Sequence, residues 1–471
     1  MERSALTALY LDEVRQRGLR ASDLLGDLPG LKPYYYGGRY LSRPLFIGDS
    51  ECRQLYADVE NVQTAVFGLP DRLFGGDFAA FAQAVGAYGA VAAVLTGQNA
   101  GQNAGQSNMP TRLARADLFV GETGFQLLEL NQGSALGGTD NGDMCRALLR
   151  HPVLAEFARA HRLGYVDTMR NQVDTMLAET GLEPGSCPVV ALTTWPNGYE
   201  PMMKPYMEAV AAAWRKLGID AHGCQLGELS RRRGRVWLED RPVDAIFRMF
   251  PTGLLHESSR TTAMVAPILD AAARGEVKLC APLESDIFSS KAALAMISDE
   301  ANRHLFTAAE LASIDRIVPW TRLVRPGPVT VPDGSRADLL HYAMSRQNEL
   351  VIKPSLGRAG IGVVPGWEHS PEQWRALITS VSAPWYVIQK RVRPELELFP
   401  DEHGELIPWI PVWGLFTGSQ GYGGIYARAV LDTGTDIINQ ALGAFVGCCL
   451  SVGHPLPFPD SATPSEDHHK R

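Results

Sequence analysis

Four polar side chains at two-residue spacing stand in two neighbouring apolar segments. Arg115 and Asp117 belong to the first segment, and Glu129 and Asn131 belong to the second. The Gly-Glu-Thr-Gly sequence between the segments is typical of a hairpin turn. Because residues two apart share one face of a strand, the hairpin would gather one cation and three oxygen-bearing side chains. Such oxygens suit a Mg²⁺ ion that also binds water and phosphate, although a surface hairpin with alternating polar residues explains the same pattern.

A lysine and a glycine-rich loop occur together in the sequence VIKPSLGRAGIGVV, residues 351–364. Lys353 ends an apolar run, and Gly357, Gly360 and Gly362 follow before the next apolar run begins. Small residues let backbone N–H groups approach a phosphate, with a cation beside it. The spacing matches neither the dinucleotide-binding fingerprint nor the P-loop. We therefore expect a β-hairpin lid over a nucleotide, with a plain hairpin loop as the alternative.

The composition is that of an ordinary globular protein, with 471 residues, 45% of them hydrophobic, and a net charge of -8. This charge gives no reason to expect a nucleic-acid partner, and the basic cluster at residues 230–236 is interpreted as a solvated turn. No apolar run approaches the roughly 20 residues of a membrane span. The seven cysteines form no C-x-x-C pair, which favours reduced thiols. Together with an N-terminus that lacks a signal-peptide core, these features predict a cytoplasmic protein.

The strands and helices that must position these residues can be expected from the sequence pattern, which predicts a mixed α/β fold with several parts. Residues 186–285 alternate strand, helix and strand, which is typical of a small parallel α/β domain. Residues 1–185 carry the polar hairpin and, from about 141 to 181, a long helical region, and residues 286–452 carry the glycine-rich lid. The tandem GQNA repeat at residues 97–108 is expected to be a linker, and residues 453–471 a disordered tail.

Five segments, taken in order, resemble the circularly permuted ATP-grasp ligases, in particular the glutathionylspermidine synthase group. The first is the R-x-D pair with an E-x-N pair twelve residues after the aspartate, which is similar to the family's magnesium-binding segment. The others are SSKAALAMI with Lys291, VIKPSLGRAGIGV with Lys353, YVIQKRV with Gln389, and GYGGIYARAV with Arg428. In the permuted order the E-x-N pair precedes the nucleotide lysines, as it does here. The amidase domain of some synthetases is missing, so glutathione and spermidine are not assumed as substrates.

The resemblance implies a permuted ATP-grasp fold with the α/β domain inserted as a substrate-binding domain. It also implies an ATP-dependent carboxylate–amine ligase that forms an amide through an acyl phosphate. Asp117, Glu129 and Asn131 would bind one or two Mg²⁺ ions. Arg115 and Arg428 would flank the transferring phosphoryl group as catalytic residues.

The resemblance also supplies nucleotide-binding residues, which are Lys291, Lys353, Gly357, Gly360, Gly362 and Gln389. Three further residues, Ser134, Trp195 and Arg248, are weaker candidates for substrate contacts, with turn and core packing as the alternative. The expected substrates are a small-molecule carboxylate and an amine, drawn from amino acids, small peptides and polyamines. A small-molecule kinase of the same fold and a non-catalytic nucleotide-binding protein stay open as alternatives. The oligomeric state also stays open, with a homodimer as one option.

Overall fold

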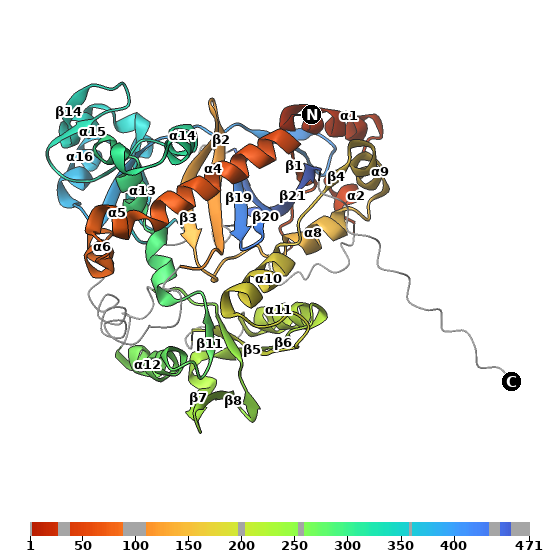
Figure 1. Ribbon diagram of the computed structural model, residues 1–471. Coiled ribbons are helices and arrows are strands. Elements are labelled where there is room, and N and C mark those ends of the chain that lie inside the picture. The colour runs from red at the N-terminus through yellow and green to blue at the C-terminus, as the bar shows by residue number, and fades with distance from the viewer. Residues whose placement is uncertain are drawn as a thin grey trace.

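The computed structural model describes residues 2–26, 38–87, 110–195, 203–252, 259–357, 360–432 and 443–453. Its strands form five sheets, and helices are interspersed among them along the chain, so the expected mixed α/β class is confirmed (Figure 1). The interpretations of the GQNA repeat, and of nearly all of the C-terminal tail, fall outside the described residues. None of the helices in the described ranges is long and apolar enough to cross a membrane.

An eight-stranded sheet forms the centre of the molecule. Its main path runs β1-β21-β20-β19-β2-β3, with β18 paired to β19 and β4 paired to β21. In chain order its strands are β1 (Leu45–Ile47), β2 (Ala114–Gly121), β3 (Gly124–Gln132), β4 (Leu163–Gly164), β18 (Glu397–Pro400), β19 (Leu406–Gly418), β20 (Gly421–Leu431) and β21 (Phe445–Val452). The hairpin predicted around Gly-Glu-Thr-Gly is confirmed, because β2 and β3 pair antiparallel with Gly121 opposite Gly124.

The two faces of the central sheet differ in chemistry. Ala114, Ala116 and Leu118 of β2 are buried in the largest hydrophobic cluster, as are residues of the long helix α4 (Asp49–Phe67). In α4 the buried residues recur at intervals of three and four, the period of one helix face. Figure 1 shows α4 running across the sheet. The alternate residues of β2, which include Arg115 and Asp117, must therefore face away from this cluster.

A four-stranded parallel sheet lies beside the central one and follows the order β11-β10-β5-β6. Its strands are β5 (Val189–Thr194), β6 (Asp220–Gln225), β10 (Ala245–Arg248) and β11 (Lys278–Cys280). Helix α11 (Lys204–Lys216) connects β5 to β6 and buries Trp214 against Phe247, which confirms the predicted β-α-β unit. The limits of an inserted domain stay a prediction.

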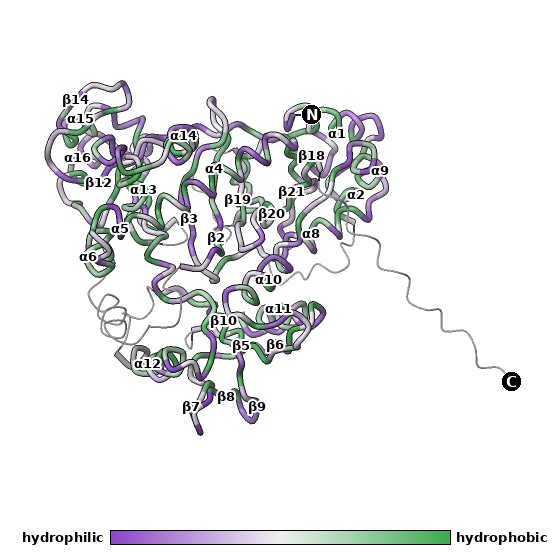
Figure 2. Tube along the Cα trace, viewed as in Figure 1, coloured by the Kyte–Doolittle hydropathy of each residue, from purple (hydrophilic) through white to green (hydrophobic). Residues whose placement is uncertain are grey.

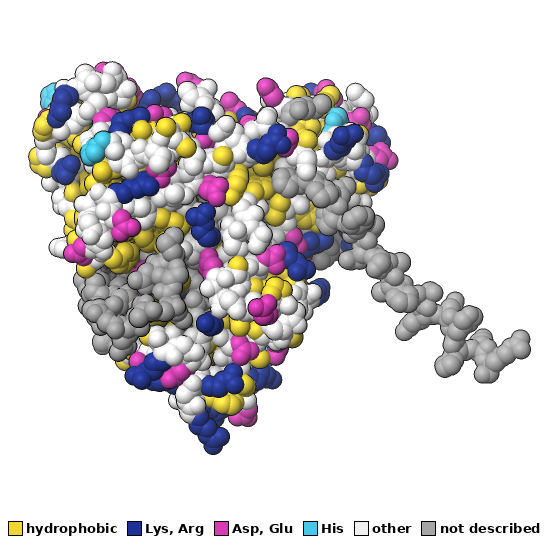
Figure 3. Space-filling model, viewed as in Figure 1, with side chains coloured by type: hydrophobic (Ala, Val, Ile, Leu, Met, Phe, Trp, Pro, Cys, Tyr) yellow, Lys and Arg dark blue, Asp and Glu magenta, His cyan; other side chains and the backbone are white. Residues whose placement is uncertain are grey.

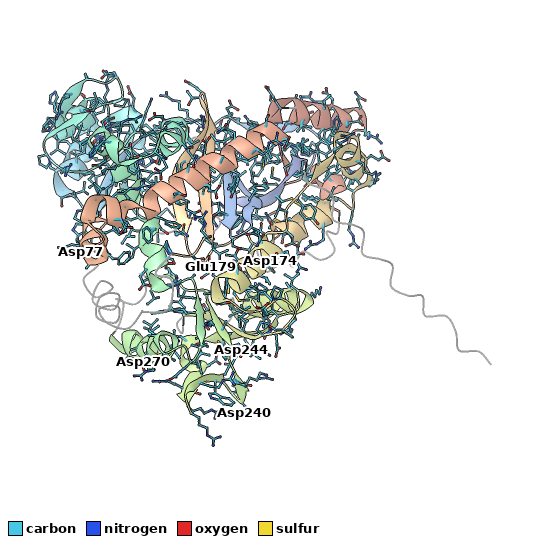
Figure 4. The ribbon with its side chains drawn as sticks, in the orientation of Figure 1. Asp77, Asp174, Glu179, Asp240, Asp244 and Asp270 are labelled. Carbon is cyan, nitrogen blue, oxygen red and sulfur yellow. The ribbon has the colours of Figure 1, made fainter. Side chains whose placement is uncertain are left out.

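A small antiparallel sheet extends from this parallel sheet through β7 (Leu229–Arg232), β8 (Arg235–Leu238) and β9 (Arg241–Pro242). The basic residues at the β7–β8 turn are exposed, as the sequence predicts. This tip is hydrophilic in Figure 2 and carries dark blue Lys and Arg side chains in Figure 3. Among the residues labelled in Figure 4, Glu179 lies in the helix before β5, and Asp244 directly precedes β10. Glu179 accepts hydrogen bonds from the Thr111 hydroxyl and from the Arg112 backbone, just before β2.

A second four-stranded sheet, in the order β12-β17-β15-β16, carries the glycine-rich segment. Its strands are β12 (Thr321–Leu323), β15 (Leu350–Pro354), β16 (Val364–Pro365) and β17 (Tyr386–Lys390). Strands β15 and β16 pair antiparallel, with Val351 opposite Pro365, so the predicted strand–loop–strand hairpin is confirmed. Helices α15 (Leu339–Ser345) and α16 (Pro371–Ser380) and the hairpin β13 (Pro328–Thr330) and β14 (Arg336–Asp338) complete this region.

The long helical stretch predicted at residues 141–181 is divided into three helices. These are α8 (Asn141–Leu148), α9 (Pro152–His161) and α10 (Thr168–Thr180). Pro152 opens α9 at a position where its missing N–H costs nothing, and the left-handed Arg162 ends it. The remaining helices are α1 (Arg3–Gln16), α2 (Ala21–Leu25), α5 (Leu69–Phe74), α6 (Phe78–Ala84), α12 (Ser259–Ala273), α13 (Lys291–Ile297) and α14 (Ala308–Ile317).

Candidate active site

A cavity of about 370 Å³ has walls from the central sheet and from the sheet that carries the glycine-rich hairpin. Strands β2, β3 and β20 supply one side, strands β15 and β17 supply the other, and Lys291 at the start of α13 reaches in between. Nine of the residues predicted from the sequence line this cavity: Arg115, Asp117, Glu129, Asn131, Lys291, Lys353, Gly360, Gln389 and Arg428. Segments more than 300 residues apart in the chain therefore meet at one place.

Asp117 is held by two arginines. Arg115 donates from Nε to Oδ1 at 2.7 Å and from Nη2 to Oδ2 at 3.0 Å. Arg428 contacts Oδ2 through Nη2 at 2.7 Å. Burial acts to raise the pKa of the Asp117 carboxyl, but the two guanidinium groups outweigh it and hold that pKa well below its usual range. Asp117 is therefore an anion at any physiological pH.

Glu129 lies opposite Asp117 across the β2–β3 ladder, and Asn131 lies opposite Arg115. The Lys291 ammonium is 2.9 Å from Glu129 Oε2. Burial would raise the pKa of Glu129, yet the charge of Lys291 holds it below the ordinary value. The Asn131 amide donates to Asp117 Oδ2 at 3.0 Å and to Glu129 Oε1 at 3.4 Å, which joins the two carboxylates into one network.

Lys353 lies on the opposite wall of the cavity. Its ammonium donates to Gln389 Oε1 at 2.6 Å and to the Leu128 carbonyl oxygen at 3.2 Å. The Gln389 amide in turn donates to the Thr321 hydroxyl at 3.0 Å, which fixes the orientation of the glutamine. Burial, assisted by the positive charge of Lys291, lowers the pKa of Lys353 to about 8. Below this pH the lysine is a cation, and its two hydrogen bonds hold it in place. No carboxylate among the described residues pairs with it.

The cavity has an excess of positive charge. Two carboxylates line it, those of Asp117 and Glu129, against six cationic side chains, those of Arg115, Lys291, Lys353, Lys390, Arg391 and Arg428. Charges in a partly buried cleft act on one another more strongly than they would in water. The described walls therefore suit a ligand with several negative charges, as a triphosphate has.

The glycine-rich hairpin contributes Gly360 and Val363 to the cavity wall. Gly360 and Gly362 have φ values of 73° and 76°, which disfavour any residue with a side chain. A Cβ atom on Gly362 would also lie 2.8 Å from the Pro354 ring. Gly357 and Gly362 belong to the same hairpin but not to the cavity lining. The hairpin therefore brings its backbone, rather than bulky side chains, to the cavity.

The three predicted substrate contacts, Ser134, Trp195 and Arg248, also lie outside the cavity lining. Ser134 is fully buried and donates to the carbonyl oxygen of Arg248. Trp195 packs against Phe250 at a ring distance of 5.4 Å. Arg248 is 1% exposed and donates to Asp286 and to the carbonyl oxygens of Ala281 and Pro282. Their side chains serve packing and internal hydrogen bonding, so this geometry does not support the predicted substrate contacts.

The donor set of the cavity fits Mg²⁺. No group of three or more His, Cys, Asp or Glu side chains that could hold a metal occurs within the described ranges. Asp117, Glu129 and Asn131 instead offer two carboxylates and one amide in one hydrogen-bonded network. Mg²⁺ is commonly bound by one or two carboxylates while phosphates and waters complete its octahedron.

Several residues of the cavity escape the sequence interpretation. Tyr426, Leu136 and Gly137 line it, and the Gly137 carbonyl oxygen accepts a hydrogen bond from Arg115. Trp367 also lines it and stacks on Arg391, whose guanidinium carbon is 3.6 Å from the ring centroid. Tyr426 alone had a readable signal in the sequence, because it precedes Arg428 by two residues and therefore shares its strand face.

Comparisons with known proteins support the fold. No protein-family model and no curated protein matches this chain. A glutathione synthetase-like effector from Globodera pallida matches 95% of this chain and 97% of its own, at 12% identity and a TM-score of 0.56. A putative gamma-glutamylcysteine synthetase from Methylobacillus flagellatus matches 72% of this chain and 80% of its own, at 13% identity and a TM-score of 0.42. D-cycloserine synthetase matches 57% of this chain and 92% of its own, at 14% identity and a TM-score of 0.25. The first of these shows that the chain has a fold similar to that of the glutathione synthetase-like effector.

Proposed function

We propose that this protein is an ATP-dependent carboxylate–amine ligase with a circularly permuted ATP-grasp fold. One observation carries the proposal: residues from five separate segments, each matching a motif of that family, line a single cavity with an excess of positive charge. In this proposal ATP lies between the central sheet and the hairpin-bearing sheet. Residues 186–285 are assigned as the substrate-binding domain.

The cavity residues divide between metal and nucleotide. Asp117, Glu129 and Asn131 would hold one or two Mg²⁺ ions, whose charge offsets that of the phosphates. Lys291 and Lys353 would bind phosphate oxygens, with Gln389 setting the position of the second lysine through their hydrogen bond. Lys291 pairs with Glu129, and Arg428 pairs with Asp117. Metal and phosphate would exchange with these internal partners.

The reaction requires a carboxylate to approach a triphosphate, and the two repel each other. Arg115 and Arg428 lie on either side of Asp117 and present guanidinium forks, whose planar geometry suits a phosphoryl group. Donors fixed before the reaction stabilise the charge that develops in the transition state. Both arginines contact the same carboxylate, that of Asp117, which places their guanidinium groups close together.

Two steps complete the proposed reaction. A carboxylate oxygen of the acid attacks the γ-phosphorus, and ADP leaves with the bridging oxygen. The amine nitrogen then attacks the acyl carbon, loses a proton, and displaces inorganic phosphate. The hairpin that β15 and β16 form would limit the entry of water, which would otherwise hydrolyse the acyl phosphate.

The test is ADP release with Mg-ATP across a panel of amino acids, small peptides and polyamines. The wild type is compared with Glu129→Ala and with the control Glu122→Ala, which removes an exposed carboxylate from the turn of the same hairpin. We expect turnover that needs both an acid and an amine, is lost in Glu129→Ala, and is kept in Glu122→Ala. A phosphorylated product without an amide would identify a kinase instead. Failure of the wild type to bind Mg-ATP would refute the proposal.

A further inference from the structure

A buried tyrosine hydroxyl stands in the cavity wall with its hydrogen-bonding capacity unused. Tyr426 is 1% exposed and lines the cavity, and its hydroxyl has no hydrogen-bond partner among the described residues. Within the same part of the chain, Nε of the neighbouring Arg428 also lacks a partner. Buried polar groups in folded proteins are nearly always paired. These two groups, two residues apart on one strand, leave two donors available to an acceptor that a ligand would supply.

The surrounding backbone is shaped to hold the Tyr426 ring. Gly138 has a φ of 86°, and a Cβ atom there would lie 2.4 Å from the ring. Gly414, between Asp117 and Tyr426 in the sheet, also has no side chain, and a Cβ atom there would lie 3.0 Å from Arg115 Cδ. At both glycines the Tyr426 ring or the Arg115 side chain occupies the space that a Cβ atom would need. The arrangement keeps the ring and the two arginines together at one end of the cavity.

The position of Tyr426 separates it from the proposed phosphate site. Across the sheet the order is Glu129, Asp117, Gly414 and Tyr426. Neighbouring strands are about 4.8 Å apart, so the tyrosine lies about 10 Å beyond Asp117 on the side away from Glu129. Lys353 and Gln389, which are assigned to the nucleotide, belong to the other wall. In the proposed function, the Tyr426 end of the cavity is therefore the part left for the acid substrate.

The chemistry of this end selects an anionic acceptor. Arg115 and Arg428 share one carboxylate, that of Asp117, so the group keeps a positive charge. Burial raises the pKa of the Tyr426 hydroxyl above its ordinary value, so the proton stays on the oxygen at neutral pH and is available to donate. A carboxylate oxygen is the acceptor that both the charge and the free donors favour.

We propose that Tyr426 is a specificity-determining residue whose hydroxyl donates to a carboxylate oxygen of the acid substrate, beside Nε of Arg428. This inference rests on the proposed ligase function, because it identifies which end of the cavity receives the acid. Gly137 lines this end of the cavity without a side chain, and Gly138 packs closely against the Tyr426 ring.

The test compares Tyr426→Phe with Tyr422→Phe. Both lie on β20, but Tyr422 is outside the cavity lining and its hydroxyl hydrogen-bonds to Cys52 and Ser451. Binding to full-length protein is measured by calorimetry with Mg-ADP and with a set of carboxylates (acetate, succinate, glutarate and the amino acids) in the presence of Mg-ADP. Thermal unfolding of each variant is measured without ligand.

The two variants should behave in opposite ways. Tyr426→Phe should weaken the carboxylate that binds the wild type by roughly tenfold, the effect of one lost hydrogen bond to a charged group, and leave Mg-ADP binding unchanged. Its unfolding temperature should stay equal or rise, since an unpaired buried hydroxyl is removed. Tyr422→Phe should lower the unfolding temperature and bind the carboxylate normally.

Each outcome decides the inference. Equal carboxylate affinity in wild type and Tyr426→Phe would overturn it, and so would the absence of binding by every carboxylate in the set. Mg-ATP turnover together with either of those results would leave the ligase standing without this role for Tyr426. Tyr426-dependent carboxylate binding in a protein that never releases ADP would support the subsite and refute the ligase.

Discussion

Two buried arginine–aspartate groups in this protein differ in how completely they are hydrogen-bonded. Outside the cavity, Arg248 donates to Asp286 and to three backbone carbonyl oxygens. Inside the cavity, Asp117 accepts from Arg115 and from Arg428, while Arg428 Nε lacks a partner among the described residues. Every guanidinium nitrogen of Arg248 donates to an acceptor within the protein, whereas Nε of Arg428 does not. Residue type alone therefore does not distinguish a structural arginine from one placed to bind a ligand.

The largest expected effect concerns the fully hydrogen-bonded ion pair of Arg248 and Asp286. Asp286→Ala would leave the 1% exposed Arg248 guanidinium without its carboxylate. Breaking a buried ion pair from one side costs about 3–5 kcal/mol, so we expect a loss of stability of that size. Urea unfolding followed by fluorescence measures it. An unchanged free energy of unfolding would remove the structural half of the comparison.

The next effect concerns the cavity group. Arg428→Met should lower ligase turnover by about 10²–10³-fold, the usual result of removing one preorganised donor from a transition state. Its unfolding free energy should fall less than that of Asp286→Ala, because Arg115 still neutralises Asp117. Steady-state kinetics and urea unfolding are run on the same preparations. Equal turnover in the wild type and in Arg428→Met would contradict the catalytic role assigned to Arg428.

A smaller effect should depend on pH through Lys353, whose pKa is lowered to about 8. Below that pH the free protein already carries the proton, and above it the lysine is neutral. The charge of ATP should restore the proton, so binding weakens by up to about tenfold per pH unit above pH 8 and takes up a proton there. Calorimetry at about pH 9 in two buffers of different ionisation enthalpy measures the uptake. Lys353→Arg, which stays charged, should abolish it, and equal uptake in both proteins would contradict the prediction.

The smallest effect is expected at the surface. Asp270, labelled in Figure 4, pairs with Arg231 at 2.6 Å and with Arg274 at 3.1 Å, but all three side chains are partly exposed. Exposed ion pairs contribute about 0–1 kcal/mol. Asp270→Ala should therefore change neither ATP binding nor, measurably, thermal unfolding. A loss comparable to that of Asp286→Ala would show that burial is not what separates these groups.

Much of the fold could be predicted from the sequence, because it depends on local patterns. The β2–β3 hairpin follows from a turn sequence between alternating strands, and the β15–β16 hairpin from two apolar runs around glycines. The division of residues 141–181 into three helices was missed, although Pro152 and the left-handed Arg162 mark two of its boundaries.

The candidate site was only partly predictable. The polar residues that line the cavity carry motifs, so nine of them could be named before the fold was known. The structural role of Arg248 could not be predicted from the sequence. Its partners are carbonyl oxygens and a carboxylate that come from positions as far as 38 residues away. Tyr426 was missed for a related reason: an unsatisfied hydroxyl becomes visible when the packing around it is known.

The most direct test of the central claim follows the oxygen atoms of the acid. Once the panel identifies an acid and an amine, the acid is supplied with both carboxylate oxygens as ¹⁸O, and the released phosphate is analysed by mass spectrometry. An acyl-phosphate ligase predicts one labelled oxygen in each phosphate and one in the amide product. If the amide forms and the phosphate released with it carries no label, the proposed reaction is contradicted.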